Sequence, residues 1–84
     1  MEVDVRGRRI TLMPHEAGRL VELARAQASR SSRARDLALG LERARAARPV
    51  VLQRGDERVV ARLLRGRDDL GPGLEALRAI VTTS

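Results

Sequence analysis

The first twelve residues alternate between apolar and polar side chains. Val3 and Val5 alternate with polar neighbours, Ile10 and Leu12 do so again, and Gly7 lies between the two runs. Alternation of this kind is typical of strands with one buried face, and a glycine between two such runs is typical of a hairpin turn. The pattern therefore predicts a β-hairpin with one apolar face.

The pattern then changes to a helical period. Pro14 suits the first position of a helix and Glu16 suits its first turn, which predicts a helix over 14–28. Either Ser31 or Ser32 suits the cap of a second helix, over about 32–47, which Pro49 would end. At 100° per residue, each helix has one apolar arc, with Leu39 alone on the far side of the second helix. The arcs contain Ala17, Leu20, Val21, Ala24 and Ala28 in the first helix, and Ala34, Leu37, Ala38, Leu41 and Ala44 in the second.

Two interpretations are open after the short β-rich run Val50–Leu52. The sequence Arg54-Gly55-Asp56 suits a hairpin turn that leads to a strand at Val59 and Val60. An internal repeat with a period of 40 residues favours a helix over 54–65, ended by Gly66. The repeat matches Ile10, Leu12, Glu16, Leu20 and Leu23 with Val50, Leu52, Asp56, Val60 and Leu63. It also predicts that the 50–52 strand pairs with the 10–12 strand.

A last helix begins at Pro72, with its apolar positions in register. These positions are Leu74, Leu77, Ile80 and Val81. The sequence thus predicts an α+β fold of order ββααβαα, in one small domain over 1–84. A two- or three-stranded sheet, made of the hairpin and one short strand, is covered by about four helices.

Composition points to a small core. The 84 residues include 24 large aliphatic side chains and no aromatic ones. Aromatic side chains bury about 150–250 Å² each, so their absence leaves a chain of this length with little apolar area to bury. We therefore expect self-association, as a dimer or a higher homo-oligomer.

Several function classes are excluded or disfavoured. Without Cys and with His15 alone, opposite the apolar arc of its helix, we expect no disulfide, metal site or cofactor. Without aromatics there is no base-stacking platform. We find no nucleophile elbow, no phosphate-binding loop, no membrane span and no signal peptide. We therefore expect a non-enzymatic, cytoplasmic protein.

Charge offers the one candidate site that the residues themselves suggest. All 17 basic residues are Arg, against 11 acidic residues, which gives a net charge of +6. If 54–65 is helical, Arg54, Arg58, Arg62 and Arg65 fall within about 80° of one another. Over about 16 Å this ridge could meet two or three phosphates or an acidic protein surface. The alternative is the solvated face of a helix in a chain whose arginines reflect GC-rich coding.

Residues 8–47 combine one short strand with two helices. They contain Arg9-Ile10-Thr11-Leu12-Met13-Pro14, a helix with Leu20-Val21-Glu22-Leu23-Ala24, the loop Ser29-Arg30-Ser31-Ser32, and a second helix with Leu37 and Leu41. In these features the stretch resembles ribbon-helix-helix DNA-binding domains, a group that includes many antitoxins. The resemblance implies a dimeric ribbon whose Arg9, Thr11 and Met13 face the major groove. It further implies a phosphate at Ser31 and Ser32.

Taken together, these observations favour a small basic interaction module that associates with itself and binds a protein partner. The identity of that partner is not readable from the sequence. A nucleic-acid-binding regulator of ribbon-helix-helix or antitoxin type is the alternative.

Overall fold

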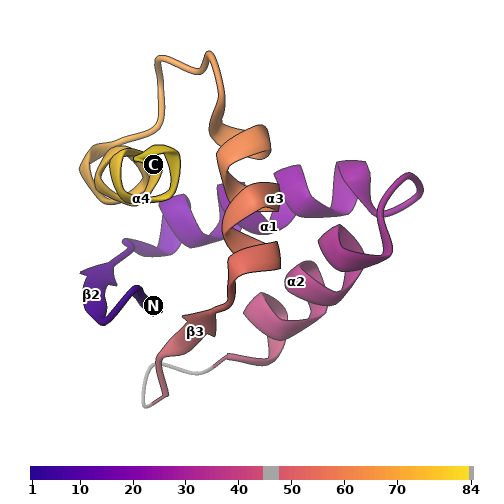
Figure 1. The fold of residues 1–84 in the computed structure, drawn as a ribbon, viewed down its shortest axis with the longest axis horizontal. Coiled ribbons are helices and arrows are strands. Elements are labelled where there is room, and N and C mark those ends of the chain that lie inside the picture. The colour runs from indigo at the N-terminus through magenta and orange to yellow at the C-terminus, as the bar shows by residue number, and fades with distance from the viewer. Residues whose placement is uncertain (45–47, 84) are drawn as a thin grey trace.

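The computed structural model describes residues 1–44 and 48–83. It has an α+β fold with the order ββααβαα, which confirms the predicted fold class (Figure 1). The elements are β1 (Glu2–Val5), β2 (Arg8–Thr11), α1 (Pro14–Gln27), α2 (Ser32–Arg43), β3 (Val50–Leu52), α3 (Arg54–Leu64) and α4 (Pro72–Thr82).

The predicted hairpin is present. Strands β1 and β2 pair antiparallel, with Glu2 opposite Thr11 and Val5 opposite Arg8, so Arg6 and Gly7 form a two-residue turn. Both turn residues have positive φ, +53° at Arg6 and +76° at Gly7. Positive φ at both central positions matches the twist of the flanking strands, but it is uncommon for a residue with a side chain.

Strand β3 pairs with β1, so the prediction that it pairs with the 10–12 strand is wrong. The sheet order is β2-β1-β3, and β3 runs parallel to β1 with Val3 opposite Val50 and Val5 opposite Leu52. The central position suits β1 because Val3 and Val5 are both fully buried. With a neighbour on each side, β1 has its backbone paired along both edges as well.

The helices follow the predicted pattern, with one clear difference in length. The interpretation of 54–65 as a helix is confirmed, and Gly66 follows α3 with φ +72°. Helix α2 ends at Arg43, because Ala44 is extended and Leu41 is the last buried residue of the helix. The predicted second helix ran to 47, and its residues 45–47 lie outside the described part of the chain.

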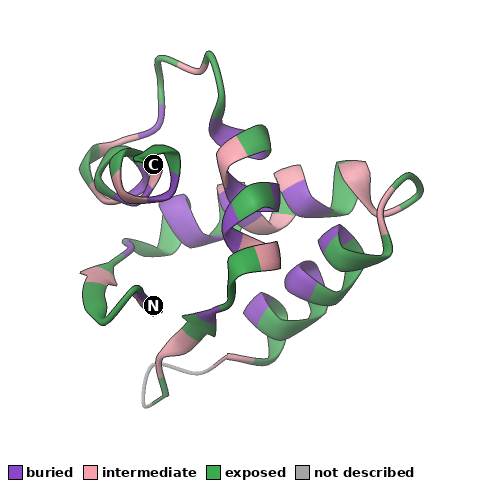
Figure 2. Ribbon diagram, in the orientation of Figure 1, coloured by how far each residue is buried: buried purple, intermediate pink, exposed green. Residues whose placement is uncertain are grey.

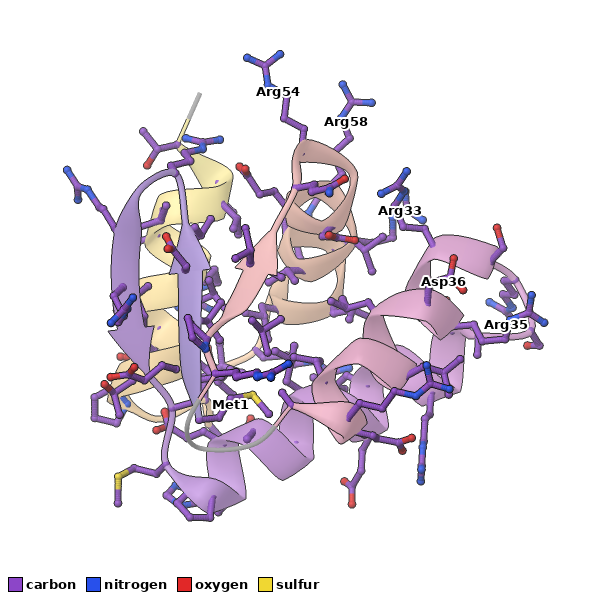
Figure 3. The ribbon with its side chains drawn as sticks, turned by 90° about the horizontal axis from the view of Figure 1, so that it is seen from below. Met1, Arg33, Arg35, Asp36, Arg54 and Arg58 are labelled. Atoms are coloured by element: carbon purple, nitrogen blue, oxygen red, sulfur yellow. The ribbon has the colours of Figure 1, made fainter. Side chains whose placement is uncertain are left out.

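The helices turn their apolar faces toward a common core, as Figure 2 shows. Helices α3 and α4 lie behind the sheet in Figure 3, and no described helix covers the opposite face of the sheet. The largest fully buried apolar side chains are Leu12, Leu20, Leu41, Leu64, Leu74, Leu77, Val3, Val5 and Val60.

The 40-residue repeat extends over β2, α1 and α2 in the first half and β3, α3 and α4 in the second. Helices α1 and α3 begin at positions 14 and 54, and helices α2 and α4 begin at positions 32 and 72. Buried residues recur at the same spacing, in the pairs Leu12 and Leu52, Leu20 and Val60, Ala24 and Leu64, Ala34 and Leu74, Leu37 and Leu77, and Leu41 and Val81. Strands β2 and β3 flank β1 and run in opposite directions. Residues 8–43 and 50–82 thus form two βαα halves, whose strands lie on opposite sides of β1 and run in opposite directions, as they would after a two-fold rotation about β1.

Reciprocal contacts between the halves agree with this rotation. Glu16, in the first turn of α1, accepts hydrogen bonds from the Met13 amide and from the Leu74 amide at the start of α4, each 3.0 Å long. Its equivalent Asp56, in the first turn of α3, accepts one from the Gln53 amide. The Asp56 carboxylate also lies 3.6 Å from the Arg33 guanidinium at the start of α2. In each half, the first helix thus presents its carboxylate to the second helix of the other half.

Candidate functional site

The four ridge arginines lie together on the exposed side of α3. Arg54, Arg58, Arg62 and Arg65 are all exposed, whereas Val59, Val60, Leu63 and Leu64 on the opposite side are buried. Within the described ranges, no carboxylate lies within ion-pair distance of any of the four guanidiniums. Figure 3 shows Arg54 and Arg58 extending away from the body of the protein at the start of α3.

The hairpin turn brings a further basic group beside the ridge. Arg6 Nε donates to Glu57 Oε1 in the first turn of α3 at 2.7 Å, and Arg6 Nη1 donates to the Thr83 carbonyl at 2.9 Å. These bonds hold the hairpin turn against α3 and the end of α4. Arg8, exposed at the start of β2, follows the same turn. We call the set Arg6, Arg8, Arg54, Arg58, Arg62 and Arg65 the arginine face.

Three shallow hollows surround the last turn of α4, and arginines from this face line each of them. The first, about 420 Å³, is lined by Arg6, Arg8, Ala79, Ile80 and Thr83. The second, about 700 Å³, is lined by Arg6, Arg54, Glu57, Arg58, Val81, Thr82 and Thr83. The third, about 390 Å³, is lined by Ala61, Arg62, Arg65 and Thr82. Each hollow thus combines guanidinium groups with at least one aliphatic side chain.

Glu57 is the acidic residue that lines these hollows. Its side chain is buried and already engaged by Arg6, so it offsets the charge of one guanidinium of the face. Among residues 1–44 and 48–83, no carboxylate pairs with the other guanidiniums of the face. Guanidinium groups without a protein carboxylate are suited to bind carboxylates or phosphates from another molecule, because they present several donors in a planar fork. The arrangement is suited to anion binding.

The internal repeat supplies a comparison within the chain. Because positions 54, 58, 62 and 65 correspond to 14, 18, 22 and 25, the ridge of α3 is equivalent to Pro14, Gly18, Glu22 and Arg25 on α1. The α1 residues are exposed too, yet they include one basic and one acidic side chain. Coding bias acts on both helices alike, so it does not explain why one of two equivalent faces is entirely Arg.

The residues implied by the ribbon-helix-helix resemblance fall into two separate groups. Thr11 and Met13 are exposed at the end of β2 and the start of α1, and Arg9 pairs with Glu2 at 3.7 Å. Ser31 caps α2 through a hydrogen bond from the Ala34 amide, and Ser32 begins that helix. The two groups lie at opposite ends of α1, as Figure 1 shows. At 1.5 Å per residue, the 14 residues of α1 separate them by about 20 Å.

Among residues 1–44 and 48–83, no group of three His, Asp or Glu side chains is placed to hold a metal ion, and His15 is exposed. No helix of the described chain is long and apolar enough to cross a membrane. The described side chains that line the hollows supply donors and aliphatic surface, with Glu57 already ion-paired.

Sequence reasoning found the ridge but missed the rest of the face. Arg6 and Arg8 precede the ridge by more than 40 residues, and their proximity follows from the pairing of β1 with β3. The available signal was Arg6-Gly7 at the predicted hairpin turn, where Asn, Asp or Gly is the usual first residue.

A scan against protein-family models, a search of curated proteins and a search of solved structures each found no match to this chain.

Proposed function

We propose that this protein is a non-enzymatic interaction module whose arginine face binds an acidic surface of a protein partner. The main support for the proposal is the contrast between the equivalent helices α1 and α3. The four ridge positions are all Arg on α3, whereas the equivalent positions on α1 are Pro, Gly, Glu and Arg and carry no net charge. Exposed charge that no described carboxylate pairs with raises the encounter rate with an oppositely charged partner and favours that partner over others.

The aliphatic groups in the hollows favour a protein over a nucleic acid. Val81, Ile80 and Ala61 lie beside guanidinium groups in the three hollows. A protein partner offers apolar side chains for the aliphatic positions and carboxylates for the arginines, whereas a phosphate backbone offers only anionic groups for the arginines. Nucleic-acid binding is the alternative, favoured by the length of the ridge, which would span about two or three phosphates.

A pair of matched variants tests the proposal. In the ridge variant, Arg54, Arg58, Arg62 and Arg65 are replaced by Gln. In the control variant, Gln replaces Arg30, Arg35, Arg43 and Arg48, which are exposed and make no ion pair or side-chain hydrogen bond within the described ranges. Each variant lowers the net charge by four, from +6 to +2.

We expect the ridge variant to lose about tenfold or more in affinity for poly-glutamate, measured by fluorescence anisotropy at about 150 mM salt. The control should lose much less, because its arginines are spread around α2 and the adjoining segments. Equal losses would mean that net charge alone drives binding and would contradict the proposal. Tighter ridge-dependent binding of a DNA duplex, with a salt slope near −0.9 per phosphate contacted, would favour the nucleic-acid alternative.

Both variants should remain folded. Exposed ion pairs contribute about 0–1 kcal/mol, and Gln keeps most of the helix propensity of Arg. The free energy of unfolding of each variant should therefore lie within about 0.5 kcal/mol of the parent protein in urea titrations. Such a result would separate the effect on binding from an effect on folding.

A further inference from the structure

We infer that the arginine face accommodates an acidic amphipathic helix of the partner, laid alongside α3 with its carboxylates on the ridge and its apolar side chains in the adjoining hollows. This inference rests on the proposed function and adds the shape and register of the partner segment.

The spacing of the ridge arginines along α3 is the first observation that favours a helical partner. Arg54, Arg58 and Arg62 are four residues apart and Arg65 follows after three, so the guanidiniums begin about 6, 6 and 4.5 Å apart along α3. A second helix with carboxylates at i, i+4, i+8 and i+11 repeats these intervals, because the two helices have the same rise per residue. Each carboxylate would then meet one guanidinium.

Other partner shapes match this spacing less well. Alternate side chains on one face of a strand lie about 6.8 Å apart, so a strand would run out of register by roughly 4 Å over the four arginines. The phosphates of a DNA strand follow a helical path around the duplex, so the straight ridge would meet only two or three of them. The intervals of the ridge therefore favour a helix.

The hollows beside the ridge are the second observation, and they favour a partner helix with an apolar stripe. The ridge arginines line two of them, one of about 700 Å³ near Arg54 and Arg58, and one of about 390 Å³ near Arg62 and Arg65. Val81 lines the larger hollow and Ala61 the smaller one. Both hollows lie between α3 and the last turn of α4, so they flank the ridge on the same side. A partner helix with carboxylates on one stripe and apolar residues on the next stripe places both kinds of group where this face receives them.

The arginine side chains themselves favour this geometry. Their aliphatic stems can cover the apolar stripe of a partner helix while the guanidinium groups remain near its carboxylates. Helices packed side by side lie about 8–10 Å apart, within reach of such long side chains. The partner segment that this face fits is thus both acidic and amphipathic.

Two peptides of about 20 residues with identical composition test the inference. The first has Glu at i, i+4, i+8 and i+11, with Leu on the adjacent stripe. The second has the same residues distributed evenly around the helix. Both are held helical by side-chain cross-links away from the tested stripes, and equal helicity is checked by circular dichroism.

We expect the first peptide to bind about tenfold or more tightly than the second at about 150 mM salt, and to lose that advantage with the ridge variant. Replacing Ala61, which is half-buried, by Leu would fill the smaller hollow. It should weaken the first peptide several-fold and leave poly-glutamate binding unchanged.

The outcomes separate the two proposals. Equal affinity for both peptides, still dependent on the ridge arginines, would overturn the helix inference and leave the proposed function standing. Peptide affinities that are the same for the parent protein, the ridge variant and the control variant would overturn the proposed function. A DNA duplex that competes with the first peptide and binds more tightly at the same salt would overturn the choice of a protein partner.

Discussion

At the scale of single residues, Glu16 shows how one carboxylate stabilises two helices. It is buried and accepts backbone hydrogen bonds at the starts of α1 and α4. The hydrogen bond from the Met13 amide, together with those from Leu74 and Gly73, holds the pKa of Glu16 below its ordinary value, although burial acts in the opposite direction. Anionic groups are favoured at helix N-termini, where backbone N–H groups have no partner within the helix.

We expect Glu16→Gln to lower the free energy of unfolding by about 1–3 kcal/mol at pH 7, because the amide accepts hydrogen bonds more weakly than the carboxylate. Since the folded pKa is depressed, the contribution of the charge is present above the ordinary value of 4.5 and is lost as pH falls through the folded pKa. Urea titrations at pH 7 and near pH 3 measure the difference. A loss of equal size at both pH values would show that the charge is not responsible.

The sequence predicts only part of this arrangement. The place of Glu16 in the first turn after Pro14 follows from helix-start rules. Its contact with Leu74 joins residues 58 positions apart and depends on how the two halves pack. Local patterns contain no information on that packing, so the second capping role could not be predicted.

At the scale of elements, the contact between α4 and β2 depends on one glycine. A Cβ added at Gly73 would lie 2.8 Å from the Thr11 carbonyl oxygen and 2.9 Å from Glu16 Oε1. The equivalent position in the other half is Arg33, whose guanidinium lies beside Asp56. Glycine therefore allows α4 to begin close to β2.

We expect Gly73→Ala to destabilise the protein by about 1–3 kcal/mol, because backbone and a buried carboxylate would have to move. Gly18→Ala is the matched control, because Gly18 lies on the exposed face of α1 and a Cβ added there would have no heavy atom within 4 Å. It should stabilise the protein by about 0.5–1 kcal/mol through helix propensity. Thermal and urea unfolding of both variants measure the difference, and the same sign of effect at both sites would contradict this account.

Sequence patterns predicted the elements well and their pairing less well. Alternation at Val3 and Val5 and the helical period after Pro14 are local signals, and they located the hairpin and α1. From the sequence, β3 could pair with β1 or with β2, which have similar apolar faces. Which of them it joins depends on which strand is central in the sheet. The repeat correctly favoured α3 as a helix, yet it gave the wrong neighbour for β3, because a two-fold rotation places equivalent strands on opposite sides of β1.

At the scale of the whole molecule, self-association stays a prediction. Single chains already bury the core, and Met13, Leu39 and Val51 are large apolar side chains that remain exposed. We expect sedimentation equilibrium at micromolar concentration to give a mass of at least twice 9.3 kDa. We also expect a double variant, with Leu39→Glu and Val51→Glu, to have a lower mass in the same measurement. A stable monomer of 9.3 kDa would contradict the prediction.

The reciprocal carboxylates of Glu16 and Asp56 have a consequence for a chain divided in two. If the protein is produced as separate fragments, 1–44 and 45–84, each fragment lacks the carboxylate that the other supplies to its second helix. Neither fragment should fold by itself, and an equimolar mixture should recover the helical circular dichroism of the intact chain by complementation. Each βαα half would thus act as one part of a split protein, and the two parts would become structured only together.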